Sequence, residues 1–414
     1  MKSGLPDRGM DSGPGSRSLL WGAWLLGFFM FALMLSLPPM LGLIQRELSL
    51  SYSQAGFLLS APILLIALSA VPAGLLADRF GPHATAGLGI ILVAVFGSLR
   101  GVAGGFPSIL LFSCLLGAGV GLIYPALPKL VGSTLPSDMA AKATAIYTVG
   151  INVGATAGLG ATMTLIFPLV GTWRGSLFLW SALASVAILY WWGLRRGPAC
   201  REEAPSDPIP LVPVWRRGRV WILCGVFAVG VMLFYAMVGW LPEILHQKGA
   251  SIPLASFLTS LVTLLGIPTT ILAPLASERL GLRKPFLYLG FLFTAACILA
   301  LLWTPLNIDG LILVVAGIAL DLLFVFGLLL IAEVVEAEAI GRAGGLVLSV
   351  GYLGGVLGPS LTGYLRDVTG GFDFPLLFLG LLSLASIAAV AALPETGRRE
   401  ALRERSPRAS GAGE

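Results

Sequence analysis

Asp321 is an acidic residue in the middle of a long apolar stretch, Gly317-Ile-Ala-Leu-Asp321-Leu-Leu-Phe-Val-Phe326. An ionised carboxylate at the centre of a bilayer costs about 2.5–3.5 kcal/mol, so such residues face a cavity, find a partner or take up a proton. Burial in an apolar medium favours the protonated form of a carboxyl group, which suits Asp321 to proton exchange. The alternative is a structural acid with a hydrogen-bond partner.

A second set of charged residues recurs at a lag of 200 positions. Gly74-Leu-Leu-Ala-Asp78-Arg79-Phe-Gly81 returns as Pro274-Leu-Ala-Ser-Glu278-Arg279-Leu-Gly281. The same lag relates four further pairs, which are Ser51 and Ser251, Trp21 and Trp221, Gly154 and Gly354, and Gly158 and Gly358. Repetition at half the length of an apolar chain is typical of a two-lobed transporter.

The elements that carry these residues must lie in lipid. The chain has 414 residues, 57% hydrophobic and 11% charged, with a mean hydropathy of +0.91. Soluble proteins carry about 25% charged residues, so this chain cannot cover a water-facing surface. We therefore expect the lipid bilayer to be its main partner.

Twelve segments are long and apolar enough to cross a bilayer, which needs about 20 residues per helix. They are 19–43, 53–77, 84–104, 107–131, 140–167, 174–194, 218–243, 252–276, 285–304, 309–332, 343–365 and 374–394. We predict an all-α membrane protein with an N-terminal tail (1–18), two six-helix bundles (19–195 and 218–394), a linker (196–217) and a C-terminal tail (395–414). Ser53 and Asp309 are the expected first residues or caps of two of these helices.

The charged loops predict the orientation. With a cytoplasmic N-terminus, 21 of the 26 Lys and Arg residues fall on the cytoplasmic side. Positive charge is retained inside, so both termini and the linker are predicted to be cytoplasmic in a multi-pass protein of the plasma (inner) membrane.

Several classes of function are disfavoured. The four cysteines and two histidines form no metal-binding spacing, and we expect no metal and no cofactor. No Gly-Lys-Ser/Thr phosphate loop and no nucleophile–base pair is evident, so we expect no enzyme. The basic residues are spread over loops, which disfavours nucleic acid, and we expect a monomer.

The loop Gly74-x-x-x-Asp78-Arg79-x-Gly81 resembles the signature of the major facilitator superfamily, over a chain whose twelve helices also fit that family. The resemblance implies a cytoplasmic gate in which the acid faces a helix N-terminus of the opposite lobe. The gate residues so implied are Gly74, Asp78, Arg79, Gly81, Glu278, Arg279 and Gly281. The sequence departs from the pattern at Pro82-His83, where the family carries basic residues.

Glycines at four-residue spacing predict close helix packing. The residues concerned are Gly150, Gly154 and Gly158 in one helix and Gly351, Gly355, Gly358 and Pro359 in another. The glycine–proline pair of the family's drug-antiporter subset is missing after Gly154, where Ala155 follows.

By the same resemblance, four helices line the pathway, and their mid-membrane polar residues are candidates for substrate or proton contact. These are Ser36, Tyr124, Tyr235 and Asp321, with Asn152 on a supporting helix. Arg100, near the outer end of the third segment, attracts an anionic substrate to the outer mouth, extends to the headgroups or forms a structural pair. Pro38-Pro39 and Pro125 are expected to kink their helices.

Two stretches are similar to the cyanate permease group, which includes 2-nitroimidazole transporters. They are Tyr235-Ala-Met-Val-Gly-Trp240-Leu-Pro242 and Val350-Gly-Tyr352-Leu-Gly-Gly-Val-Leu-Gly358-Pro359. The resemblance implies a secondary transporter that moves a small, cyanate-like anion with protons by alternating access. No midplane cation is evident, so a drug-type exporter of neutral or weakly basic compounds is the alternative. A transporter-like sensor or assembly factor is the alternative of another class.

Overall fold

The computed structural model describes residues 14–135, 137–194, 217–335 and 340–396, and its regular elements are helices. These are α1 (Pro14–Leu35), η1 (Pro38–Met40), α2 (Leu41–Leu48), α3 (Tyr52–Phe80), α4 (Pro82–Leu99), η2 (Arg100–Val102), α5 (Phe106–Thr134), α6 (Ser137–Ala161), η3 (Thr162–Ile166), α7 (Phe167–Val170), α8 (Trp173–Gly193), α9 (Gly218–Gln247), α10 (Ile252–Leu280), α11 (Lys284–Ala300), α12 (Leu306–Val334), α13 (Ile340–Thr369) and α14 (Asp373–Ala391). Within the described residues, eleven helical spans can cross a bilayer, and α11 is a shorter apolar helix of 17 residues. The predicted all-α membrane fold is confirmed, while the predicted linker lies almost entirely outside the described residues.

Local sequence explains where the helices begin and end. Pro38 and Pro39 interrupt the first span between α1 and α2, because proline has no N–H to donate. Ser51 caps α3 by accepting a hydrogen bond from the Gln54 N–H at 3.1 Å. Ser251, 200 positions later, caps α10 in the same way. The expected cap at Ser53 was wrong by two residues, because the serine whose side chain accepts the helical N–H lies further upstream.

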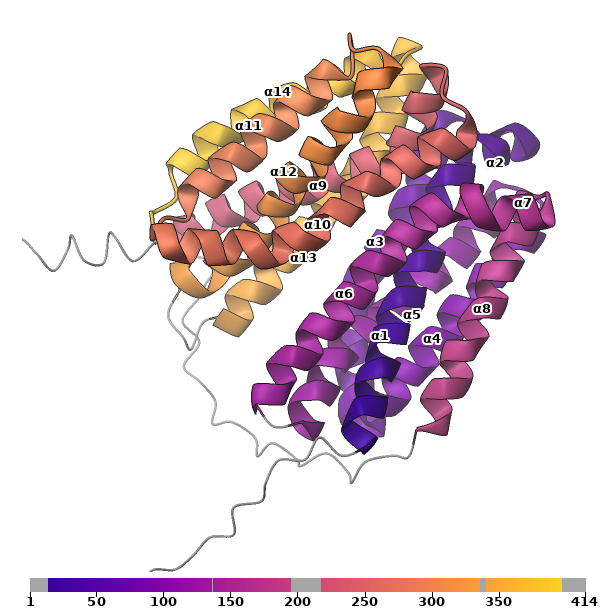
Figure 1. Ribbon diagram of the computed structural model, residues 1–414, viewed down its shortest axis with the longest axis vertical. Coiled ribbons are helices and arrows are strands. Elements are labelled where there is room, and N and C mark those ends of the chain that lie inside the picture. Colours follow the sequence, from indigo (N-terminus) through magenta and orange to yellow (C-terminus); the bar gives the residue numbers. More distant parts are fainter. Residues whose placement is uncertain (1–13, 136, 195–216, 336–339, 397–414) are drawn as a thin grey trace, which may run out of the picture.

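The helices form two lobes, α1–α8 and α9–α14, which lie side by side (Figure 1). Glycines bring the helices of each lobe into backbone contact. A Cβ added to Gly150 would lie 2.5 Å from the Trp24 carbonyl oxygen of α1, and one at Gly154 would overlap that of Phe28. In the second lobe, a Cβ at Gly354 would overlap the Ala228 carbonyl oxygen of α9. The predicted packing therefore occurs at repeat-related positions in both lobes.

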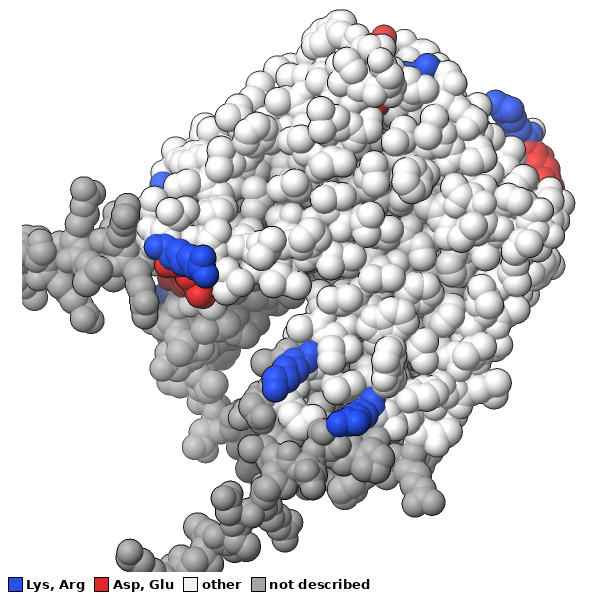
Figure 2. All heavy atoms as spheres, viewed as in Figure 1, with Lys and Arg blue, Asp and Glu red and all other residues white. Residues whose placement is uncertain are grey.

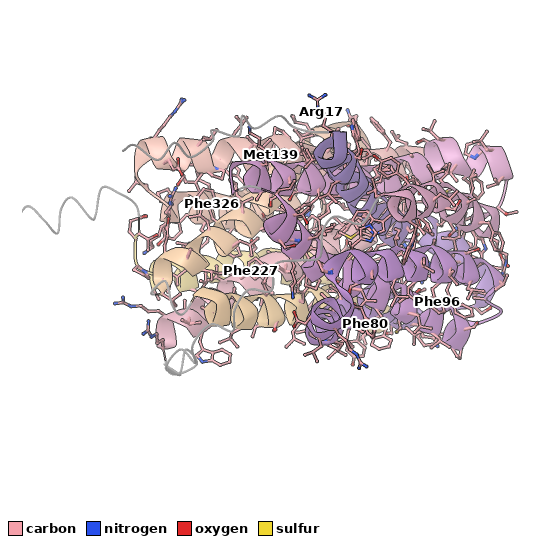
Figure 3. The ribbon with its side chains drawn as sticks, turned by 90° about the horizontal axis from the view of Figure 1, so that it is seen from below. Arg17, Phe80, Phe96, Met139, Phe227 and Phe326 are labelled. Carbon is pink, nitrogen blue, oxygen red and sulfur yellow. The ribbon has the colours of Figure 1, made fainter. Side chains whose placement is uncertain are left out.

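The second glycine run also accommodates a large side chain. The ring of Phe227 is 2% exposed and fills the space left by Gly351 and Gly327, so that a Cβ at either glycine would overlap it. Figure 3 shows Phe227 and Phe326 within the C-terminal lobe and Phe80 on the N-terminal lobe. The ring thereby packs α9 against α12 and α13.

The molecule has two ends, which we name the terminal face and the far face. The terminal face holds the start of α1 and the ends of α3, α8, α10 and α14, and the far face holds the opposite helix ends. Charged side chains gather near the ends in Figure 2, and the surface between them is almost uncharged. The lobes meet towards the far face (Figure 1), and the space-filling view shows a hollow between them at the terminal face (Figure 2).

Candidate transport pathway between the lobes

The first contact between the lobes joins α3 to α13 in the half nearer the far face. A Cβ at Gly56 would overlap the Pro359 carbonyl oxygen, so the two helices touch through their backbones. One turn further along, the Ser60 hydroxyl donates to the Val356 carbonyl at 2.6 Å and accepts from the Ser360 hydroxyl at 2.8 Å. Backbone contact and hydroxyl bridges together close this side of the pathway.

The second contact joins α6 to α10 at a similar depth. The Thr156 and Thr263 hydroxyls are 3.0 Å apart, and the Ser256 hydroxyl donates to the Leu159 carbonyl. Gly160 lies against Ser260 of α10. Small hydroxyl residues on both helices allow this close approach and satisfy each other's hydrogen bonds.

Asp367 adds a charged contact at the far face itself. Its carboxylate, at the end of α13, accepts from the backbone N–H of Tyr52 at 3.0 Å and of Ser53 at 2.7 Å. The Ser53 hydroxyl donates to it at 2.5 Å. These donors are the first turn of α3, so an anion of one lobe binds the positive helix end of the other. This is the geometry expected for the signature loop, observed at the opposite face.

Three tyrosines meet at the centre, where the two lobes begin to diverge. The side chains of Tyr124 (α5) and Tyr352 (α13) lie close to each other across the two lobes. Tyr235 (α9) lies near both, and its ring packs against Gly355. Phe31 of α1 completes the aromatic wall with its ring centroid 6.3 Å from that of Tyr124. Two of the nominated residues are thus brought together, and Tyr352 joins them.

Asp321 lies on α12 and is bonded to α10 of the same lobe. Its Oδ2 is 3.0 Å from the Thr270 hydroxyl, and that hydroxyl is also 2.9 Å from the Gly266 carbonyl. Gly266 leaves the room for the carboxyl group, because a Cβ there would lie 3.2 Å from the Asp321 Oδ1. The acid therefore has a hydroxyl partner 51 residues away in sequence.

Ser36, Asn152 and Arg100 occupy other places. Ser36 is fully buried and donates to the Leu33 carbonyl at 2.9 Å, so its hydroxyl is engaged at the end of α1. Asn152 lies on α6, where its carbonyl accepts from Thr156 one turn below the second lobe contact. Arg100 does not extend to the headgroups, because it is 1% exposed and donates to the same Leu33 carbonyl at 2.7 Å.

The signature-loop residues lie at the terminal face, on the rim of the hollow. The Asp78 carboxylate is paired with Lys129 of its own lobe rather than with the other lobe. Gly81 has φ +85° and joins α3 to α4, as the tight turn requires. A Cβ at Gly74 would meet no atom within 4 Å, so no helix approaches it closely when the hollow is open. Glu278 and Arg279, with Gly281 at φ +67°, occupy the related turn.

Two helical lobes that enclose a polar centre, close towards one face and open to the other define a membrane transporter of the alternating-access class. The chain belongs to the Major Facilitator Superfamily, whose family model matches residues 23–312 and 240–412. That family consists of transporters rather than enzymes.

Relatives and solved structures agree with this assignment. The chain is 27% identical to the 2-nitroimidazole transporter of Escherichia coli (84% of this chain, 87% of that one). It is 25% identical to the hexuronate transporter of Bacillus subtilis (84% and 87%) and 24% identical to the cyanate transport protein CynX of E. coli (84% and 90%). A bacterial homologue of the lysosomal transporter Spinster, solved in an inward-facing conformation, superposes with a TM-score of 0.73 at 19% identity (92% and 95%).

Proposed function

We propose that this transporter moves a small, cyanate-like monovalent anion together with a proton across the inner membrane. The observation that carries the proposal is the Asp321–Thr270–Gly266 arrangement. When Asp321 is ionised, the Thr270 hydroxyl uses its one proton to donate a hydrogen bond to the carboxylate. When Asp321 is protonated, it donates to Thr270, which then donates to the Gly266 carbonyl. The Asp321–Thr270 hydrogen bond is kept in both protonation states, which lowers the cost of taking up and releasing a proton.

The central tyrosines support a small anion as the solute. A tyrosine hydroxyl can donate a hydrogen bond to an anion, and the aromatic rings around it limit the size of the solute. The carboxylate of Asp321 is engaged with α10, which makes it a poor counter-ion for a cationic drug. Cyanate and hexuronate, the solutes in the names of two relatives, are anions. One proton per monovalent anion would move no net charge.

The face assignments belong to the same proposal. We place the terminal face in the cytoplasm, because most of the Lys and Arg residues then lie inside. The state described here would then be inward-open, and the proposed functional unit is a monomer of two six-helix bundles. In the alternate state, the signature loops of Asp78 and Glu278 would close the cytoplasmic gate against the opposite lobe.

The test is uptake of labelled cyanate by proteoliposomes under an imposed pH gradient. A gradient of one pH unit should drive about tenfold accumulation for one proton per anion, since 1.4 kcal/mol corresponds to a factor of ten. We expect the Asp321→Asn variant to exchange cyanate across the membrane but to lose gradient-driven accumulation. Asp373→Asn, which neutralises an exposed acid at the start of α14, is the control and should accumulate like the wild type.

The outcome also separates the alternatives. Gradient-driven accumulation by Asp321→Asn equal to that of the wild type would exclude this acid as the proton carrier. No uptake of any anion by the wild type, with protection of cells from neutral or weakly basic drugs, would favour the drug-type exporter.

A further inference from the structure

Arg100 is a buried cation that the proton-coupling step does not use. It lies in η2, at the end of α4, and is among the largest fully buried side chains of the described residues. One guanidinium nitrogen donates to the Leu33 carbonyl at 2.7 Å, and its Nε has no hydrogen-bond partner. Within the described part of the chain, no carboxylate is recorded in an ion pair with it. The charge is therefore both desolvated and uncompensated.

A small cavity between the two lobes lies beside this guanidinium. Its walls include Pro38 and Leu59 of the N-terminal lobe and Tyr235 and Pro359 of the C-terminal lobe. It has room for about one water molecule, and no acidic side chain lines it. The cavity lies in the half of the pathway that is closed towards the far face. Its walls would separate when the lobes part on that side.

A structural role accounts for only part of this arrangement. The carbonyls in the last turn of a helix lack intrahelical partners, and Leu33 is in the last turn of α1. Ser36 already donates to the Leu33 carbonyl, so a neutral donor is present for this cap. A full positive charge in an apolar site is costly without a counter-charge, and a cap alone does not require it. The charge is explained if an anion is its partner in another state of the cycle.

We propose that Arg100 is the binding residue for the anionic substrate in the state open to the far face. This inference rests on the proposed anion transport and names the group that recognises the anion. When the lobes part, Tyr235 and Pro359 move away with the C-terminal lobe and the guanidinium faces the opened cavity. Its planar donors then bind the oxygen or nitrogen atoms of a small monovalent anion. When the far face closes, the anion passes to the central tyrosines.

The test compares the two faces of the membrane in vesicles of known orientation. For Arg100→Gln, we expect the KM for cyanate presented at the far face to rise about tenfold or more, because a charge-assisted hydrogen bond is lost. The KM at the terminal face should change far less. Arg46→Gln is the matched control, since Arg46 is an exposed arginine on the far side. It should leave both constants near those of the wild type.

Arg100→Lys keeps the charge and a single donor nitrogen but not the planar fork, and it is the variant to use if Arg100→Gln cannot be purified. We expect it to raise the far-face KM several-fold at near-normal thermal stability. Loss of stability with an unchanged far-face KM, or equal changes at both faces, would show that Arg100 only caps α1. If the wild type transports no anion, the proposed function and this inference fail together. If it transports cyanate and the Arg100 variants behave as the wild type, only this inference fails.

Discussion

Asp367 offers the sharpest test of how the far face is held closed. Its carboxylate accepts three hydrogen bonds from Tyr52 and Ser53, all of them between the lobes. Parting of the lobes at the far face would break these bonds, so we expect them to favour the conformation in which the hollow opens at the terminal face. Asp367→Asn removes the charge and one acceptor oxygen with little change in shape.

The size of the effect follows from these contacts. A hydrogen bond to a charged group contributes about 1.5–3 kcal/mol, and a charge at a helix N-terminus contributes about 0.3–1 kcal/mol. Asp367 is exposed, so water screens the interaction, and the asparagine keeps one of the acceptors. A net loss of about 1–2 kcal/mol is therefore expected, which shifts the ratio of the two conformations about 5- to 30-fold towards the far-open state.

Distances between spin labels on the two lobes measure this ratio. Leu169 and Trp303 are exposed positions on the far side of each lobe, and labelled cysteines there can be introduced in a cysteine-free background. The Asp367→Asn variant should enlarge the population with the longer distance, whereas Asp373→Asn should not. An unchanged distance distribution in Asp367→Asn would refute the role of this contact, and a matching shift in Asp373→Asn would show a general effect of surface charge.

Three further outcomes are expected. Gly154→Leu should lower the free energy of unfolding by about 1–3 kcal/mol or more, because the leucine side chain would overlap the Phe28 carbonyl. A melting curve like that of the wild type would contradict the packing. Lys248→Met should lower the free energy of unfolding by about 3–5 kcal/mol, because it leaves the fully buried Asp309 without its ion-pair partner. In a denaturation assay, the double variant with Asp309→Leu should regain much of that stability. Asp78→Asn should leave the melting temperature within a degree or two, since its pair is exposed, but should slow transport if the signature loop closes the other gate.

The membrane fold could be predicted because hydropathy and the repeat can both be read directly from the order of residues along the chain. The lag of 200 positions pairs Ser51 with Ser251 and Gly154 with Gly354, and the structure gives the members of each pair the same role, although the cap itself was expected at Ser53. Helix starts were harder to predict where a polar residue could either cap a helix or form an ion pair within it. Asp309 was expected to begin a helix, but it lies inside α12 and pairs with a lysine 2.6 Å away.

The candidate site was harder to predict, because it depends on which way side chains point and on partners far away in sequence. The acid of Asp321 was visible as an isolated charge, but its partner Thr270 has no distinguishing pattern. A position near the headgroups was one of the expected alternatives for Arg100, because a long side chain at a helix end can reach water, and only the fold shows that it turns inward. Tyr352 stood in a motif that carried the family resemblance, and its proximity to Tyr124 required the relative placement of the two lobes.

The backbone contacts made by the glycine runs have a consequence for engineering. Because Gly154 and Gly354 join helices through main-chain atoms, the architecture of each lobe depends little on the side chains that face the centre. We therefore expect the determinants of folding to be largely separate from the proposed determinants of selectivity. Libraries that vary Tyr124, Tyr235 and Tyr352 while the glycines are kept should yield many folded proteins, from which transporters with altered solute selectivity can be selected.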